Sequence, residues 1–245
     1  MAAQFPVRRI YCVGRNYADH AREMGGSDRE LPFFFLKPAD AALPGSVEQP
    51  ARMPYPPLTA DLHYEVELVV AIGQGGSHIP AEQAAQHIFG YAVGLDMTRR
   101  DLQSELRQQG RPWCMAKGFE ASAPIGPIVP AAHWQEASQP QPNPQPGAQR
   151  NTQPAQTVAM AGIEMAAMAQ AEISLTVNGQ LRQQGNTAQM IWSVPEIIAA
   201  ISRAWVLQPG DLIYTGTPAG VGPVVRGDTL RAEVQGLPAL QLLLV

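Results

Sequence analysis

The chain lacks the residues and runs that mark several classes of protein. Its 245 residues contain two cysteines, Cys12 and Cys114, whose wide separation gives neither a zinc pattern nor a disulfide framework. No apolar run approaches the ~20 residues that cross a bilayer, and the amino terminus lacks the apolar core of a secretory signal. We therefore expect a cytoplasmic protein with no membrane partner.

Charge is also scarce. Charged residues make up 16% of the chain, the formal net charge is −4, and Lys and Arg form no dense stripe. This distribution argues against binding to nucleic acid or to an anionic membrane, and it favours a small molecule as the partner. With 45% hydrophobic residues, the chain can bury one sizeable core.

Lysine is the rarest charged residue, with two Lys against fifteen Arg. An ammonium group is a compact charge with three donors, which a planar guanidinium cannot replace. Lys37 and Lys117 are therefore candidates for specific roles, although chance survival is an alternative for both.

Three carboxylates have the most informative placement. Glu65 and Glu67 lie two apart in the extended run 62–72, and Asp96 ends the apolar run 90–96. Because side chains alternate along a strand, the two Glu share one face of the run, and the opposite face is predicted to be core.

Two like charges about 7 Å apart on one strand face repel each other unless water or a cation screens them. An ionised Asp96 in a buried run also needs a partner. A hard divalent cation with oxygen ligands meets both needs, so Glu65, Glu67 and Asp96 are predicted metal ligands. A solvated strand face is the alternative for the two Glu.

A short helix is expected after Asn16, which is a suitable N-cap, with Gly25 beyond its end. His20 and Glu23 would then share a face, so that the carboxylate can orient the imidazole as a base that activates water. A surface pair is the alternative.

A second helix is predicted from Thr98, with Asp101 completing a capping box, to a point before Gly110. Arg100 and Gln103 share one face of it, near Asp96, where an anionic substrate group is favoured. A solvated helix face is the alternative.

Further elements follow from local signals. A strand is expected at 9–13, and another at 173–177 leads into an Asn-Gly hairpin turn. A helix from about Ser193 has an isoleucine stripe. A strand from Asp211 leads into a glycine-rich loop ending at 222, where Thr217 is a candidate donor to a ligand. A plain tight turn is the alternative.

One segment has no core-forming residues. From 135 to about 157 the chain is mostly Gln, Pro, Ala and Asn, which predicts a disordered surface insertion, and the run 160–171 is either a short helix or its continuation.

The ordered blocks together resemble the fumarylacetoacetate hydrolase family, and the match spans nearly the whole chain. The motifs that carry the resemblance are residues 11–20, 33–40, 63–67, 94–101, 117–118 and 215–222. Within the family, the chain is most similar to the short acylpyruvase-like branch, in particular to bacterial fumarylpyruvate hydrolases of gentisate breakdown.

The resemblance implies an α+β fold, a mainly β mixed roll with flanking short helices, and a homodimer. We expect an N-terminal lead-in at 1–60 and a catalytic domain at 61–245, which the insertion interrupts at about 134–170. The resemblance implies Mg²⁺ or Mn²⁺, with Ca²⁺ possible in a crystal. Its implied site residues are the ligands Glu65, Glu67 and Asp96, the dyad His20 and Glu23, the oxyanion-side Lys117, and the substrate-binding Arg100, Gln103 and Thr217; we expect Arg15 to bind substrate as well.

The expected activity is metal-dependent hydrolysis of a carbon–carbon bond of an acylpyruvate, with fumarylpyruvate yielding fumarate and pyruvate in aromatic catabolism. One alternative is an oxaloacetate decarboxylase, or another metal-dependent lyase or isomerase, which needs no dyad. A non-catalytic binding protein on the same scaffold is the other.

Overall fold

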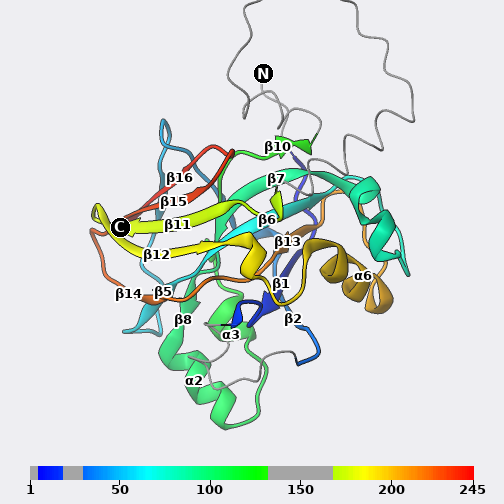
Figure 1. Cartoon of the computed structure of the whole chain (residues 1–245). Helices are drawn as coiled ribbons and strands as arrows, with labels where there is room; N and C mark the ends of the chain where they lie inside the picture. The colour runs from blue at the N-terminus through cyan, green and yellow to red at the C-terminus, as the bar shows by residue number, and fades with distance from the viewer. Residues whose placement is uncertain (1–4, 19–29, 132–167) are drawn as a thin grey trace, which may run out of the picture.

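The computed structural model describes residues 5–18, 30–131 and 168–245. These residues form mixed β-sheets with a few short helices (Figure 1). The helices are η1 (Ala39–Ala41), η2 (Ala81–His87), α2 (Arg100–Gln108), α3 (Cys114–Lys117), η3 (Thr187–Gln189) and α6 (Val194–Ala204). The strands are β1 (Ile10–Gly14), β2 (Phe33–Lys37), β3 (Ala42–Pro44), β4 (Ala51–Met53), β5 (Leu62–Tyr64), β6 (Val66–Ile72), β7 (Ile88–Leu95), β8 (Thr98–Arg99), β9 (Ala123–Ile125), β10 (Val129–Pro130), β11 (Glu172–Val177), β12 (Gln180–Asn186), β13 (Leu212–Tyr214), β14 (Gly222–Val224), β15 (Thr229–Val234) and β16 (Leu240–Leu244). The expected mainly β mixed fold is confirmed.

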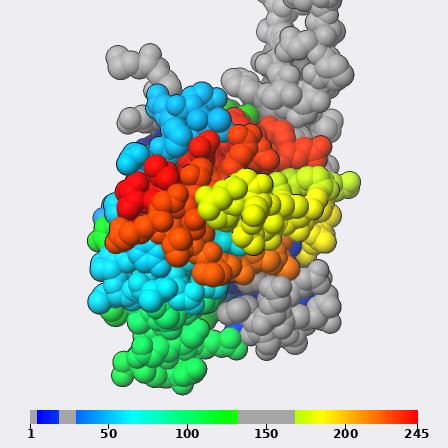
Figure 2. All heavy atoms as spheres, turned by 90° about the vertical axis from the view of Figure 1, so that its left-hand side faces the viewer, coloured from blue at the N-terminus to red at the C-terminus, as the bar shows by residue number. Residues whose placement is uncertain are grey.

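Three sheets make up this arrangement. The largest has the order β2-β1-β13-β6-β7-β9-β3, with β10 also paired to β7. The second has the order β12-β11-β15-β16-β4, and the third is β14-β5-β8. Figure 2 shows strands of the second sheet, in yellow to red, gathered on one face of the molecule, with the green α2 at the lower end. The N-terminal strands β1 and β2 are part of the largest sheet.

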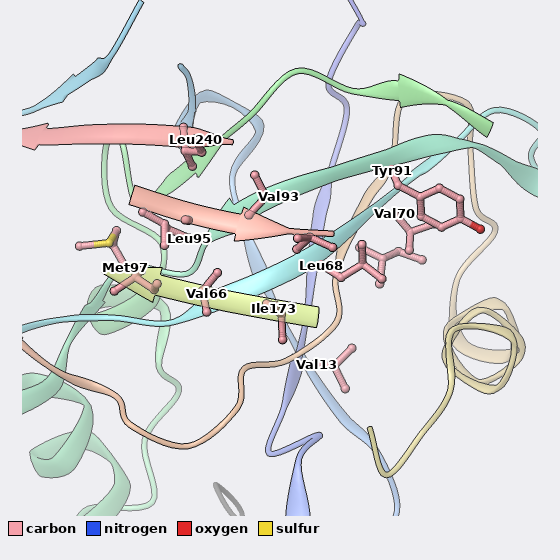
Figure 3. Close-up of a cluster of buried hydrophobic side chains, with 14 of the residues drawn as sticks. Val13, Val66, Leu68, Val70, Tyr91, Val93, Leu95, Met97, Ile173 and Leu240 are labelled. Atoms are coloured by element: carbon pink, nitrogen blue, oxygen red, sulfur yellow. The ribbon is translucent and has the colours of Figure 1, made fainter. Parts of the chain in front are cut away.

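The main core lies between the largest sheet and the second sheet. Val66, Leu68 and Val70 of β6 pack with residues of β7 and with Ile173 of β11, as Figure 3 shows. Val69 of β6, which belongs to the opposite face, lies in a second and smaller core. Both faces of β6 are therefore buried, whereas the alternating pattern predicted a single core face.

The predicted hairpin turn after β11 and the predicted helix from about Ser193 are both present. Asn178 and Gly179 have φ of 51° and 77°, which allows the tight turn between β11 and β12. Ser193 and Glu196 form a capping box at the start of α6. No helix in the described ranges is long and apolar enough to cross a membrane.

The start of α2 differs from the prediction. Thr98 pairs with His63 in the small sheet, so the helix begins at Arg100 instead. Asp101 makes no capping box, because its carboxylate accepts hydrogen bonds from Thr59 and from the backbone of Ala60. The predicted end before Gly110 is confirmed, with Gly110 at φ 62°.

Candidate functional site

The three predicted ligands meet at one end of the β6–β7 pair. Glu65 lies between β5 and β6, Glu67 lies on β6, and Asp96 follows the last residue of β7. The Asp96 backbone N–H donates to the Glu65 carbonyl at 2.9 Å, which fixes the two residues side by side. One carboxylate oxygen from each residue lies within 4.8 Å of the others, and all three residues are buried. The alternative of a solvated strand face is wrong.

Two buried lysines contact this acidic cluster of Glu65, Glu67 and Asp96. The Lys117 Nζ lies 2.8 Å from both Glu65 Oε2 and Asp96 Oδ2, and the Lys37 Nζ lies 2.8 Å from Asp96 Oδ1. Burial alone would lower the pKa of Lys117, but the carboxylates of Asp96 and Glu65 outweigh this effect and raise it. Lys117 is therefore a cation beside the cluster.

Glu67 has a different environment. Its Oε2 accepts a hydrogen bond from the backbone N–H of Gly216 at 2.8 Å, in the glycine-rich loop after β13. Burial raises the pKa of Glu67 well above its ordinary value, and the negative charges of Asp96 and Glu65 raise it further. Ionisation of the Glu67 carboxyl is therefore unfavourable in the empty site, and a cation bound to it would stabilise the ionised form.

The first turn of α2 provides the next part of the site. The Arg100 guanidinium contacts the Glu65 carboxylate, and its Nη1 donates to Gln103 Oε1 at 2.5 Å. The Arg100 Nε donates to His63 Nδ1 at 3.4 Å, while His63 Nε2 lies 2.9 Å from Asp61 Oδ1. Arg100 and Gln103 therefore share one face as predicted, and both line the same pocket as the acidic cluster.

A residue of a distant strand, Gln183, fixes the position of the Thr217 side chain. Gln183 of β12 donates to Thr217 Oγ1 at 2.8 Å and accepts from the Val66 N–H at 3.0 Å. Because the Thr217 oxygen accepts this bond, its own proton is available for donation to a ligand. Thr217 also lines the pocket.

The pocket is narrow, with a cavity volume of about 20 Å³ for a water-sized molecule. Besides the acidic cluster, its lining includes the predicted Lys117, Arg100, Gln103, Thr217 and Arg15, and the aromatic residues Phe33, Phe35 and Trp113. His20 and Glu23 lie outside the described residues, as does nearly all of the Gln/Pro-rich segment.

Two residues that shape this site, Gln183 and His63, could not be assigned to it from the sequence. Gln183 carries no local signal, because its partners lie on the strand β6 and on the loop after β13. Strand alternation puts His63 on the same face as the two Glu, but its contact with Arg100 depends on the packing of α2 against β5. The scarcity of lysine did indicate Lys37, although not its contact with Asp96.

The donor set fits a hard divalent cation. Each carboxylate offers about four lone-pair positions, so the contacts with Lys117, Lys37 and Arg100 leave acceptor capacity for an ion. Carboxylate oxygens that converge in this way are typical ligands of Mg²⁺, Mn²⁺ or Ca²⁺.

Comparison with known proteins adds the family. The model of the fumarylacetoacetate (FAA) hydrolase C-terminal family matches residues 9–244. The chain belongs to the fumarylacetoacetate hydrolase family. The family that the sequence motifs indicated is therefore confirmed, and the chain is an enzyme of this family, which includes hydrolases as well as lyases and isomerases.

Relatives in this family differ in their activities. The chain is similar to a crystal structure of fumarylpyruvate hydrolase from Pseudomonas aeruginosa in complex with Mn²⁺ and pyruvate, with 47% identity and a TM-score of 0.84, covering 100% of this chain and 92% of that one. It is 39% identical to the mitochondrial oxaloacetate tautomerase of Mus musculus, over 96% of this chain and 90% of that protein. It is 36% identical to the mitochondrial oxaloacetate decarboxylase of Dictyostelium discoideum, over 94% of this chain and 90% of that protein.

Proposed function

We propose that this protein is a metal-dependent hydrolase that cleaves the carbon–carbon bond of an acylpyruvate, with fumarylpyruvate as its main substrate. The observation that carries the proposal is the buried convergence of Glu65, Glu67 and Asp96 with Lys117 between two of them. The likeness to fumarylpyruvate hydrolase over the whole chain supports the choice of substrate.

Glu65, Glu67 and Asp96 would hold the ion, which we take to be Mg²⁺ or Mn²⁺. When bound, this ion would supply a Lewis acid for the oxygens of the 2-keto acid and for the negative charge of the departing enolate. The substrate carboxylate at this end would also receive hydrogen bonds from Arg100, which Gln103 and His63 hold in place.

The remaining steps belong to the protein's side chains. His20, oriented by Glu23, takes a proton from a water molecule whose oxygen attacks the distal carbonyl carbon. Lys117 donates a hydrogen bond to the oxyanion that forms. The bond between that carbon and the adjacent methylene then breaks, and protonation of the methylene carbon yields pyruvate beside fumarate.

A parallel assay tests the proposal. Purified protein is offered fumarylpyruvate, acetylpyruvate and oxaloacetate, with and without a chelator, and the loss of enol absorbance and release of pyruvate are followed. We expect turnover of fumarylpyruvate that a chelator abolishes and Mg²⁺ or Mn²⁺ restores. A preference for oxaloacetate would contradict the proposal.

The second candidate is an oxaloacetate decarboxylase or tautomerase, which the activities of two relatives favour. That chemistry uses the same metal and needs no base that activates water. The variant His20→Ala therefore separates the candidates: hydrolysis of fumarylpyruvate should collapse, whereas conversion of oxaloacetate should persist.

A further inference from the structure

Arg15 has an unusual conformation at the edge of the pocket. It follows β1 with φ of 53°, a left-handed value that is costly for a residue other than glycine. Residues held in this way persist where the surrounding structure fixes them, and they cluster at ligand sites. The neighbouring Gly14 has no side chain, so the ring of Phe33 packs directly on its backbone.

The Arg15 guanidinium also lacks a close partner among the described residues. Its Nε is buried and makes no hydrogen bond there, and its nearest acidic contact is Glu30 at 4.0 Å, whose side chain is 56% exposed. Lys117 and Arg100, the other two cations that line the pocket, both contact the acidic cluster. Within the part of the chain that the structure describes, Arg15 is therefore the pocket cation that has no contact with the acidic cluster and whose Nε makes no hydrogen bond.

An aromatic wall made by Phe33, Trp113 and Phe35 connects Arg15 with Lys117. The Arg15 guanidinium lies 5.8 Å from the centre of the Phe33 ring, and the Phe33 and Trp113 rings are 5.6 Å apart. Trp113 and Phe35 are 6.1 Å apart, and the Lys117 Nζ lies 5.0 Å from the Phe35 ring. Lys117, which contacts the acidic cluster, is therefore next to Phe35 of this wall, and Arg15 is next to Phe33.

From this arrangement we propose that Arg15 binds a second, distal carboxylate, and that the pocket selects extended 2-keto dicarboxylic acids with a flat apolar spacer. The inference rests on the proposed function and specifies its substrate class. A guanidinium with a free edge can bind a carboxylate through paired hydrogen bonds. Aromatic faces pack well against a planar unsaturated chain, which fumarylpyruvate has and acetylpyruvate lacks.

Kinetics of Arg15→Gln test the proposal. Loss of one charge-assisted pair in a desolvated pocket should lower the ratio of kcat/KM for fumarylpyruvate to kcat/KM for acetylpyruvate by about 30-fold or more. Arg15→Lys should recover part of the ratio, because it keeps the charge but not the paired geometry. The control Arg107→Gln removes an exposed arginine of α2, and the ratio should equal that of the wild type.

A binding experiment separates this inference from the proposed function. The ligands 2-oxoheptanedioate and 2-oxoheptanoate have the chain length of fumarylpyruvate, lack the carbonyl that water attacks, and differ only in the distal carboxylate. Calorimetry on the Mn²⁺-loaded wild type should show about tenfold or tighter binding of the diacid, and Arg15→Gln should abolish the difference.

The outcomes are distinct. Equal affinity for the two ligands, or equal losses of kcat/KM on both acylpyruvates in Arg15→Gln, would overturn the role of Arg15 even if fumarylpyruvate is hydrolysed. A preference for the diacid that depends on Arg15, without turnover of any acylpyruvate, would support the pocket assignment and overturn the proposed hydrolase.

Discussion

At the scale of single residues, Lys37 is the clearest structural cation of the site. Its ammonium group contacts Asp96 Oδ1 at 2.8 Å, donates to the Met97 carbonyl at 3.1 Å, and also donates to the Lys117 carbonyl. It thus joins a predicted metal ligand to the backbone of the lysine beside it. Because its three donors are used within the protein, we assign it to positioning and not to reaction.

The variant Lys37→Met tests this assignment. It keeps the length of the side chain but leaves Asp96 with one cation fewer, so we expect the free energy of unfolding to fall by about 3 kcal/mol. Urea denaturation of the metal-free protein measures this change. Arg107→Met, an exposed substitution on α2, should change stability by less than about 0.5 kcal/mol. Equal stability of the Lys37→Met variant and the wild type would contradict the assignment.

The raised pKa of Glu67 predicts how the affinity of the site for a metal ion depends on pH. Because its pKa is raised well above the ordinary value, the metal-free site keeps a proton on Glu67 at pH values where an ordinary Glu is ionised, and an incoming cation must displace it. Affinity should therefore rise as the pH rises towards that pKa, with net proton release. Calorimetry of Mn²⁺ binding in buffers of different ionisation enthalpy measures both quantities. An affinity that does not change with pH would exclude this linkage.

At the scale of elements, the loop after β13 connects the fold to the cluster. Gly216 donates to Glu67 and has φ of 98°, and a Cβ there would lie 2.6 Å from the Cβ of Asn16. Asn16 in turn donates to the Thr215 carbonyl and to the Trp192 carbonyl. The loop is thus fixed by contacts with two distant segments.

Gly216→Ala is expected to weaken both stability and metal binding. The matched control is Gly227→Ala, since Gly227 has a similar φ of 90° but a Cβ added there would meet no atom of the described residues within 4 Å. Both variants have the backbone strain, of about 1–3 kcal/mol, and the collision with Asn16 adds a further cost at Gly216 alone. Denaturation and Mn²⁺ titration of both variants check this. Equal losses in the two variants would show that the contact with Asn16 is unimportant.

Elements whose signals are local could be predicted from the sequence. The hairpin turn at Asn178 and the start of a helix near Ser193 depend on a few adjacent residues, and both were predicted. The start of α2 was misplaced, because Thr98 has a competing partner in β5 that local sequence does not reveal. The burial of both faces of β6 was missed for the same reason, since it depends on how the sheets stack.

At the scale of the whole molecule, the acidic cluster was predictable because Glu65, Glu67 and Asp96 lie on or directly beside the strands β6 and β7, where buried like charges need a cationic partner. The contributions of Gln183 and His63 were not, because they depend on the packing of separate sheets and of α2. The homodimer that the family resemblance implies remains a prediction. Sedimentation equilibrium should give twice the mass of one chain, and a single-chain mass at micromolar concentration would contradict it.

Titration of Mn²⁺ into chelator-treated protein tests most directly whether Glu65, Glu67 and Asp96 bind one divalent cation, as we propose. We predict one ion bound per wild-type chain and an affinity at least about 100-fold lower in Asp96→Asn, which keeps the size of the side chain but loses its charge. No binding to the folded wild type, or unchanged affinity in Asp96→Asn, would contradict the account.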